Sequence, residues 1–458
     1  MGLLDNVVHF ALHPVHLRFP LQRIVFRNNL HHHDFSTLTP TQKTCLYYLD
    51  KTGRSYSFVI KSLHAELLLP ITVFYLILRG LDTIEDDGSI KPEQKAELLS
   101  GFKDILDIDG WTFDGNGEDV LDRDLLLNFD CVITEFKRLK SVQRDILKDI
   151  TGKMGAGMAA YTCTTGTNIK TINEYDEYCW YVAGLVGEGL TRLFFEAGFV
   201  DRTLLERKDL HKSMGLLLQK TNIIRDVHED FVDCRRFWPE EIWSCHVESF
   251  DDLFKSTPNC RERALECTTH MMVNAICHIE DCLTYLSSLK EASVFNFCAI
   301  PQAMALATLE LCLMNAELYR WNLKISKRDA MGIICEVESG GIKGFCTVLL
   351  RYIKRIEEKC PPSDPTFLKL RIVCAKIEKA IDTLIRSQNT ELKSTQDIAV
   401  GEAQQEYNHV ATDQADTPPY FSLSVTLYVY LALIPGLLLL VCKMKTVIKS
   451  QVPSIYSH

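Results

Sequence analysis

The sequence predicts an all-α protein in which one large helical domain is followed by a single membrane-spanning helix. Apolar residues recur at three- and four-residue steps from position 41 to about position 388, as in helices with one buried face. Almost nothing alternates with the period of two that strands show, so we expect no sheet. Glycine and proline are sparse, at 23 and 15 residues. The helical pattern occupies residues 41–50, 56–84, 92–107, 122–150, 174–199, 203–230, 260–288, 299–318, 328–359 and 365–387.

Size, charge and cysteine content narrow the classes of function. A chain of 458 residues with 47% hydrophobic residues can bury a large core. The net charge of −10 argues against a nucleic-acid-binding surface. The 17 cysteines are odd in number and contain no CxxC pair, which favours reduced thiols over a disulfide framework or a zinc site.

The first 40 residues are expected to form an irregular segment. They lack the charged start and apolar core of a signal peptide. The run from His31 to His33 could bind a metal, although a solvated segment is the favoured interpretation. We therefore assign residues 41–388 to the helical domain, interrupted by turn-rich loops at 107–118, 233–239 and 360–365.

The C-terminal part of the chain changes character twice. Residues 389–418 are polar with few large apolar groups and are predicted to be a flexible linker. Residues 419–442 are predicted to be a transmembrane anchor, because Tyr420 to Cys442 contains no charge and is long enough to cross a bilayer core of about 30 Å. A buried core helix is the alternative. Residues 443–458 would form a short tail.

Two distant segments each place polar groups in one stripe along a helix. In the first segment, Tyr75, Arg79, Asp82 and Asp86 fall at i, i+4, i+7 and i+11, with Glu85 beside them. Stacked carboxylates repel each other, so a helix gains nothing from such a stripe unless a cation neutralises it.

The second segment repeats this arrangement about 140 residues later. Gln219, Asn222, Asp226 and Asp230 fall at i, i+3, i+7 and i+11, with Arg225 beside them. Two facing stripes would bind hard divalent ions such as Mg²⁺, which usually also contacts substrate phosphates. A solvated helix face explains one acidic run, but it explains two runs with arginines in apolar surroundings less well. The pattern therefore predicts a diphosphate–Mg²⁺ site in which metal and arginine stabilise a leaving diphosphate.

Two apolar segments leave their roles open. Tyr178 to Gly189 contains several small residues, which indicate either tight helix packing or a tunnel for a lipid chain. Tyr178 is a candidate for proton handling near a carbocation. Ser293 to Gln302 contains Asn296 and Gln302, which could hydrogen-bond in the core or touch substrate. The chain has no Rossmann fingerprint, GxSxG, HExxH or Walker A motif.

Taken together, these segments resemble the squalene synthase family, the farnesyl-diphosphate farnesyltransferases, of fungal or other eukaryotic type. They occur in the family's order between about residues 45 and 350. The matching stretches are Lys51–Ser55, Phe74–Asp87, Tyr178–Gly187, Gln219–Asp226, Phe237–Pro239 and Val294–Gln302.

The resemblance implies an isoprenoid-synthase helical bundle around a central cavity and a two-step reaction. Two farnesyl diphosphates would condense head-to-head to presqualene diphosphate. This intermediate would then rearrange and be reduced by NADPH to squalene, committing isoprenoids to sterol biosynthesis. The implied cofactors are Mg²⁺ and NADPH.

The resemblance also implies roles for individual residues. Metal binding would fall to Asp82, Glu85, Asp86, Asp226 and Asp230. Catalysis would involve Tyr178, Tyr75, Asp82, Asp86, Asp226 and Asp230. Cofactor contacts would come from Arg54, Arg79, Arg225, Lys324 and Lys327. Substrate contacts would come from Ser55, Phe295, Gln219, Asn222 and Gln302.

The sequence departs from the family pattern at two positions. Leu121 and Ser326 stand where basic residues are expected, and Lys327 or Arg328 could substitute for the second. The rival interpretations are a phytoene-synthase-like enzyme that stops before reduction and a non-catalytic, membrane-tethered scaffold.

The expected location follows from the resemblance and the anchor. The domain is expected to face the cytosol from the endoplasmic reticulum membrane, with the lipid bilayer and other sterol-pathway enzymes as partners. Lysines that follow Cys442 would favour a cytosolic tail, but the large domain lacks a translocation signal, so we expect the short tail to be lumenal.

Overall fold

The structure is a computed structural model that describes residues 31, 33–53, 55–162 and 168–387. The chain divides into two units, residues 1–388 and 389–458, and every described residue belongs to the first. The predicted linker, anchor and tail lie outside the described residues, as do Arg54 and nearly all of the N-terminal segment.

The described residues are helical, and they form no strand beyond one isolated bridge between Asn168 and Arg236, which confirms the predicted fold class. The first half contains α3 (Pro40–Gly53), α4 (Ser55–Lys61), α5 (Ala65–Asp86), α6 (Pro92–Ile105), α7 (Arg123–Leu127), α8 (Asp130–Arg138), α9 (Ser141–Thr162), α10 (Ile172–Cys179), the π-helical turn η3 (Trp180–Gly184) and α11 (Leu185–Glu196). The second half contains α12 (Arg202–Glu206), α13 (Lys208–Arg225), α14 (Val227–Val232), α15 (Glu240–Trp243), α16 (Pro258–Ile276), α17 (Ile279–Ser287), α18 (Ala292–Cys312) and α19 (Lys327–Lys359). Short 3₁₀ turns η2 (Phe35–Thr37), η4 (Phe250–Phe254) and η5 (Ala316–Tyr319) connect them, and a last helix covers 367–387.

Some helix boundaries differ from the predicted ones, because a capping group begins a helix at a point where the apolar pattern simply continues. The expected helix 56–84 is two helices, because α4 ends at Lys61 and the ring of His64 accepts a hydrogen bond from the amide of Glu66 at the start of α5. The expected helix 299–318 begins earlier, since Glu291 caps α18 by accepting from the amide of Val294. Hydrophobic periodicity alone cannot locate such boundaries.

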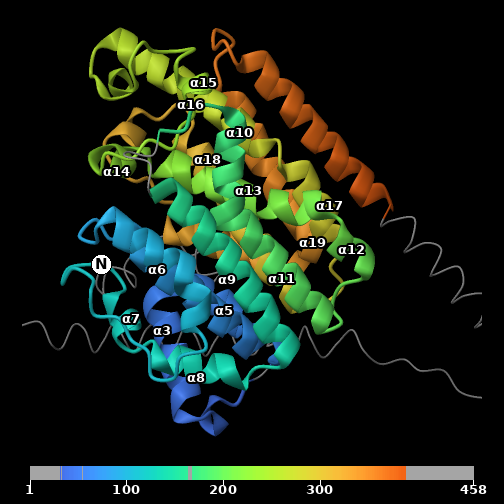
Figure 1. Ribbon diagram of the computed structural model, residues 1–458. Helices are drawn as coiled ribbons and strands as arrows, with labels where there is room; N and C mark the ends of the chain where they lie inside the picture. The colour runs from blue at the N-terminus through green and yellow to red at the C-terminus, as the bar shows by residue number, and fades with distance from the viewer. Residues whose placement is uncertain (1–30, 32, 54, 163–167, 388–458) are drawn as a thin grey trace, which may run out of the picture. The chain divides into compact units, whose positions relative to one another are not determined.

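Helix α13 lies in the middle of this unit (Figure 1) and packs against α11, α17, α18 and η3. Helices α6 and α9 pack together beside α5, and α18 packs along α19. Helix α13 also packs against α10, so it touches both the helix that carries Tyr178 and the helix that carries Gln302.

Among the described residues, two helices, α5 and α18, are long and apolar enough to cross a membrane, but 78% of each apolar window is buried inside the protein. Both are therefore core helices of this unit. Helix α5 also ends in carboxylates, and these begin the candidate site.

The described part of the histidine run is not freely solvated. The Nε2 atom of His31 lies 3.1 Å from the Oε1 atom of Glu291, and the Nε2 atom of His33 lies 2.8 Å from the carbonyl oxygen of Leu63. The two histidines are half-buried and hydrogen-bonded, whereas residues 34–37 are exposed, as expected of a solvated segment. The histidines attach the chain to the starts of α5 and α18.

Candidate active site

The first acidic stripe occupies the last turns of α5. Arg79 lies 3.9 Å from the carboxylate of Asp82 and donates a hydrogen bond of 3.3 Å to the hydroxyl of Tyr75. Its guanidinium also lies 3.8 Å from Asp122, which a left-handed backbone (φ 64°) places at the start of α7. The predicted stripe of Tyr75, Arg79 and Asp82 is thus one connected group, and Asp122 from the following loop joins it.

The second stripe crosses a break between two helices. Helix α13 ends at Arg225, and Asp226 has a non-helical ψ of 10° before α14 begins. The amide of Asp226 still donates to the carbonyl of Asn222, and the amide of Asp230 to the carbonyl of Asp226, so the three side chains stay on one face. Arg225 binds both carboxylate oxygens of Asp226, at 2.7 and 2.5 Å.

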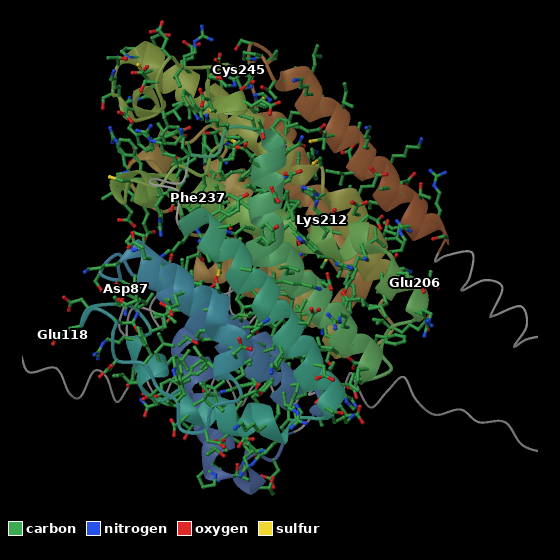
Figure 2. All side chains as sticks on the ribbon, in the orientation of Figure 1. Asp87, Glu118, Glu206, Lys212, Phe237 and Cys245 are labelled. Carbon is green, nitrogen blue, oxygen red and sulfur yellow. The ribbon has the colours of Figure 1, made fainter. Side chains whose placement is uncertain are left out.

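Arg235 connects the two stripes. Its guanidinium contacts Asp86 of α5 at 3.1 Å and Asp230 of α14 at 3.0 Å, and Asp233 at 3.4 Å. Asp87, next to Asp86, and Phe237, two residues beyond Arg235, are labelled on the same side of the view in Figure 2. The predicted convergence of the two stripes is therefore present in the structure.

Arg235 was not among the predicted site residues, although the loop at 233–239 that contains it was predicted. The loop turns back over the end of α14, because Cys234 adopts a left-handed conformation (φ 58°) and the amide of Arg235 donates to the carbonyl of Asp230. The two adjacent arginines at 235 and 236 were the only hint in the sequence of a cation at this site. The turn at Cys234 brings Arg235 into contact with the carboxylates.

Three carboxylates of the site, those of Asp82, Glu85 and Asp230, have raised pKa values. Burial, opposed by Arg79 and reinforced by Asp86, raises the pKa of Asp82 to about 6. Burial and the charges of Asp86 and Asp82 raise the pKa of Glu85 to about 8. Burial, opposed by Arg235, raises the pKa of Asp230 to about 7. The largest cause of all three shifts is burial, and a divalent cation bound to these oxygens would offset the cost of burying their charges.

Asp87 belongs to the same acidic run but has a structural role. Its side chain is buried and accepts hydrogen bonds from Ser89, from the amide of Asn116 at 2.9 Å and from the backbone of Gly117 at 3.1 Å. These bonds lower its pKa. Asp87 therefore holds the loop at 107–122 beside the site rather than facing it.

Tyr178 lies at the end of α10, directly before the π-helical turn η3. Its ring stacks on Phe237 with centroids 4.9 Å apart and meets Tyr161 edge-on at 5.1 Å. Burial raises its pKa well above the usual value, and the negative charges of Glu85, Asp86 and Asp230 add to this. Because both stripes act on it, Tyr178 lies at the acidic site, and its hydroxyl stays protonated at neutral pH.

The small residues after Tyr178 serve helix packing. A β-carbon at Gly187 would lie 2.3 Å from the carbonyl oxygen of His211, and one at Gly189 would lie 2.7 Å from the ring of Phe74. A β-carbon at Gly215 would lie 2.4 Å from the carbonyl oxygen of Ala183. Of the two interpretations left open by the sequence, the structure favours close approach of helices over a tunnel at these glycines.

A pocket of about 230 Å³ lies on the other side of Arg225. Its polar lining includes Tyr56, Asn222, Arg225 and Lys324, of which the last three were predicted site residues. Its apolar lining is Val59, Leu218, Ile300, Pro301, Met304, Ala305, Leu323, Ile325 and Ile334, with Thr221 and Thr308 between. Arg225 thus faces both this pocket and Asp226.

Other predicted contact residues lie away from the acidic side chains. Gln302 is buried, donates to the carbonyl of Met214 at 2.8 Å and accepts from the thiol of Cys282, so its amide is used by the core. Phe295 is buried against Phe345. Lys327 is exposed at the start of α19.

The remaining predicted residues are placed only by backbone or exposure. Gln219 is half-buried on α13. Ser55 begins α4. Arg54 lies outside the described residues.

The chain is similar to known proteins in both sequence and fold. The family model for squalene/phytoene synthase matches residues 49–329. A probable squalene synthase of Neurospora crassa is 48% identical over 91% of this chain and 86% of its own length. The squalene synthase of Saccharomyces cerevisiae is 42% identical over 84% of this chain and 86% of its own length. The chain belongs to the squalene/phytoene synthase family.

A solved structure supports the same assignment. The complex of TcSQS with the ligand E5700 aligns with a TM-score of 0.71 at 33% identity, covering 75% of this chain and 99% of that one. The predicted resemblance to the squalene synthases of fungi is therefore confirmed, and so is the predicted isoprenoid-synthase fold of the helical unit.

The two departures from the pattern expected of the family differ in kind. Ser326 caps α19, accepting from the amide of Asp329 at 3.1 Å and donating to its carboxylate. Serine is among the residues that suit this position best. Leu121, by contrast, is 68% exposed, and nothing in the structure explains the apolar residue there.

Proposed function

We propose that this family member is a squalene synthase. It condenses two molecules of farnesyl diphosphate head-to-head to presqualene diphosphate and then reduces that intermediate to squalene with NADPH. The observation that carries the proposal is the meeting of the two acidic stripes at Arg235, in a fold and family whose fungal relatives are named squalene synthases.

The acidic side chains fit Mg²⁺. All of the groups are hard oxygen donors, and the burial that raises the pKa of Asp82, Glu85 and Asp230 is a cost that a bound cation would offset. Among the described residues, no three potential ligands are close enough to hold a metal by themselves. This suits an ion that binds one or two carboxylates and completes its shell with diphosphate oxygens and water.

The predicted metal residues divide between the two stripes. Asp82, Glu85 and Asp86 would hold Mg²⁺ on the α5 side, and Asp226 and Asp230 on the opposite side. When bound, the metal screens the diphosphate and stabilises the charge on it as it leaves.

The protein's own cations would act beside the metal. Arg79, Arg225 and Arg235 each pair with a carboxylate of the site, and guanidinium groups bind phosphate oxygens in the same forked geometry. We propose that diphosphate oxygens take over part of these contacts in the complex. Removal of a single such donor typically slows a reaction by about 100-fold or more.

Tyr178 would handle protons in the first half-reaction. Its hydroxyl is protonated because its pKa is far above neutral, so it can donate to the departing diphosphate. If the hydroxyl gives its proton to the diphosphate, the phenolate that remains would accept the proton lost from the carbocation, which restores the hydroxyl. The stacked ring of Phe237 and the edge-on ring of Tyr161 limit water around it and offer aromatic groups to a cation.

The pocket beside Arg225 fits the cofactor contacts that the resemblance implies. Arg225 and Lys324 supply positive charge for phosphates, and its apolar walls suit flat rings or an isoprenoid chain. Bound NADPH would supply the reducing equivalent for the second half-reaction. Lys327 does not line this pocket, so we propose it only as a contact at the rim.

Product analysis with labelled farnesyl diphosphate tests the proposal. The full chain in detergent micelles would receive Mg²⁺ with or without NADPH. We expect presqualene diphosphate without NADPH and squalene with it. The same unreduced product in both reactions would indicate a phytoene-synthase-like enzyme, and no turnover in either would favour the non-catalytic scaffold.

We also propose that residues 419–442 anchor the protein in the endoplasmic reticulum membrane with the helical domain in the cytosol. The cysteines that the structure describes form no disulfide with one another, which supports a reducing compartment. Partners would then be the lipid bilayer and other sterol-pathway enzymes. Protease treatment of sealed microsomes should digest the domain, and a protected domain would contradict this orientation.

A further inference from the structure

Behind the acidic site lies a second charged network around Lys220. This lysine is on α13, between Gln219 and Asn222, but its side chain is only 1% exposed. Its ammonium lies 2.7 Å from the carboxylate of Asp176 on α10 and 5.4 Å from the ring centre of Tyr175. An ammonium buried this deeply needs partners that replace water.

The same ammonium begins a directed chain of hydrogen bonds. It donates to the Nε2 atom of His278 at 2.9 Å, which requires the proton of this ring to be on Nδ1. The Nδ1–H group then donates to the hydroxyl of Ser213 at 3.1 Å, and Ser213 donates to Asp281 at 2.6 Å. Burial and the charge of Lys220 lower the pKa of His278 to about 3, so the ring remains neutral.

This direction rules out nucleophilic catalysis by Ser213. The hydroxyl is buried and gives its proton to a carboxylate, while the imidazole donates to it rather than accepting from it. The network instead connects α10, α13 and the start of α17 through one ion pair and three hydrogen bonds. Buried polar networks of this kind fix the positions of the elements that they join.

We propose that Lys220 is a positioning residue that sets Tyr178 against the second acidic stripe. Asp176 precedes Tyr178 by two residues on α10, and the carbonyl of Asp176 accepts from the amide of Trp180, where η3 begins. The Lys220–Asp176 ion pair therefore holds the turn that carries Tyr178 to the helix that leads to Asp226. Asp226 and Asp230 themselves are held by Arg225 and Arg235, independently of Lys220.

The inference rests on the proposed function and predicts an effect on one half-reaction. Displacing a catalytic group by about 1 Å can cost about 100-fold in rate. We expect Lys220→Met to slow formation of presqualene diphosphate by between about 10- and 100-fold in kcat, with little change in KM. Reduction of supplied presqualene diphosphate should stay within about twofold of wild type, because the metal-binding carboxylates keep their own partners.

A double-mutant comparison tests whether the loss comes from the Lys220–Asp176 ion pair or from independent effects of the two substitutions. Asp176→Asn should slow the same half-reaction, and combining it with Lys220→Met should be no worse than the more damaging single change. Lys212→Met is the matched control, since Lys212 is on α13 (Figure 2) and makes no ion pair with the described residues. It should leave both half-reactions unchanged.

The measurement uses the full chain in detergent, with farnesyl diphosphate or presqualene diphosphate supplied separately and thermal unfolding recorded in parallel. Equal loss in both half-reactions, or no loss in either, would overturn the positioning role. If Lys220→Met does not fold, Asp176→Asn, at the more exposed end of the pair, decides the outcome by the same criterion. If the wild-type chain forms no presqualene diphosphate, the proposed function fails first, and this inference fails with it.

Discussion

The acidic site and the Lys220 network lie on either side of α13, and both are built from cations and carboxylates. In the Lys220 network the buried ammonium, the imidazole and the hydroxyl each have a partner within the protein. At the acidic site three arginines face a larger number of carboxylates, and Asp82, Glu85 and Asp230 have raised pKa values. A buried network whose groups bind one another fixes structure, whereas a site with more carboxylates than arginines can bind a cation.

The largest effects should follow from removing a charge at the acidic site. Asp82→Asn and Asp226→Asn should each abolish both half-reactions, with losses of at least about 1000-fold in kcat/KM, because each removes a ligand of the Mg²⁺ proposed to assist diphosphate departure in both steps. The measurement is steady-state turnover with each intermediate supplied separately. Asp233→Asn is the control, since Asp233 is exposed and is the most distant of the three carboxylates that contact Arg235. Near-normal turnover of Asp82→Asn would contradict the assigned role.

A smaller and more selective effect is expected where the two regions meet. Tyr178→Ala should block formation of presqualene diphosphate, because it removes the hydroxyl that exchanges protons with the departing diphosphate. Conversion of supplied presqualene diphosphate to squalene should continue. The control is Tyr175→Phe on the same helix, whose buried hydroxyl has no hydrogen-bond partner among the described residues. A Tyr178→Ala enzyme that still condenses farnesyl diphosphate would show that another group handles the proton.

The acidic site should also make the stability of the protein depend on pH. The folded-state pKa values of Asp82, Glu85 and Asp230, about 6, 8 and 7, lie above those of carboxyl groups in an unfolded chain. Their protonation therefore stabilises the metal-free protein at low pH, and this stabilisation is lost as pH rises through 6 to 8.

Mg²⁺ should reverse this loss, because it competes with protons for the same carboxylates. We expect the rise in Tm on addition of Mg²⁺ to chelator-treated protein to increase from pH 6 to pH 8. Thermal unfolding at a series of pH values measures this. A rise in Tm that is independent of pH would show that these carboxylates do not bind the metal.

The smallest effect should come from a residue outside both regions. Ser326→Ala removes the cap of α19 and should lower the free energy of unfolding by about 1 kcal/mol. Turnover should be unchanged, because the serine bonds only within its own helix. Denaturant titration and a product assay together test this. If turnover falls in proportion to a loss of NADPH affinity, Ser326 contacts the cofactor despite its capping role.

Much of the acidic site was predictable because helical periodicity fixes which side chains share a face. The stripes through Asp82 and Asp226 needed only the spacing of residues along a helix. The family motifs in their order predicted the fold, because they are long and specific. Helix boundaries at His64 and Glu291 were harder, since a capping bond decides them while the apolar pattern continues.

The sequence did not predict which groups certain side chains would contact in the folded protein. Arg235 reaches Asp86 only because Cys234 turns the loop back, and a left-handed residue other than glycine leaves little trace in the sequence. Asp87 looked like its acidic neighbours until its buried bonds to the loop at 107–122 were visible. From the sequence, Gln302 could have contacted either substrate or the core. Its amide donates a hydrogen bond to the carbonyl of Met214, so it belongs to the core.

The most direct test of the central claim is calorimetric titration of the full chain with inorganic pyrophosphate, with and without Mg²⁺. The two stripes face each other across Arg235, so they should bind the anion as one metal-dependent site. We expect binding only with Mg²⁺ and its loss in Asp86→Asn and Asp230→Asn alike. Binding without the metal, or loss in only one of the two variants, would contradict a site shared by both stripes.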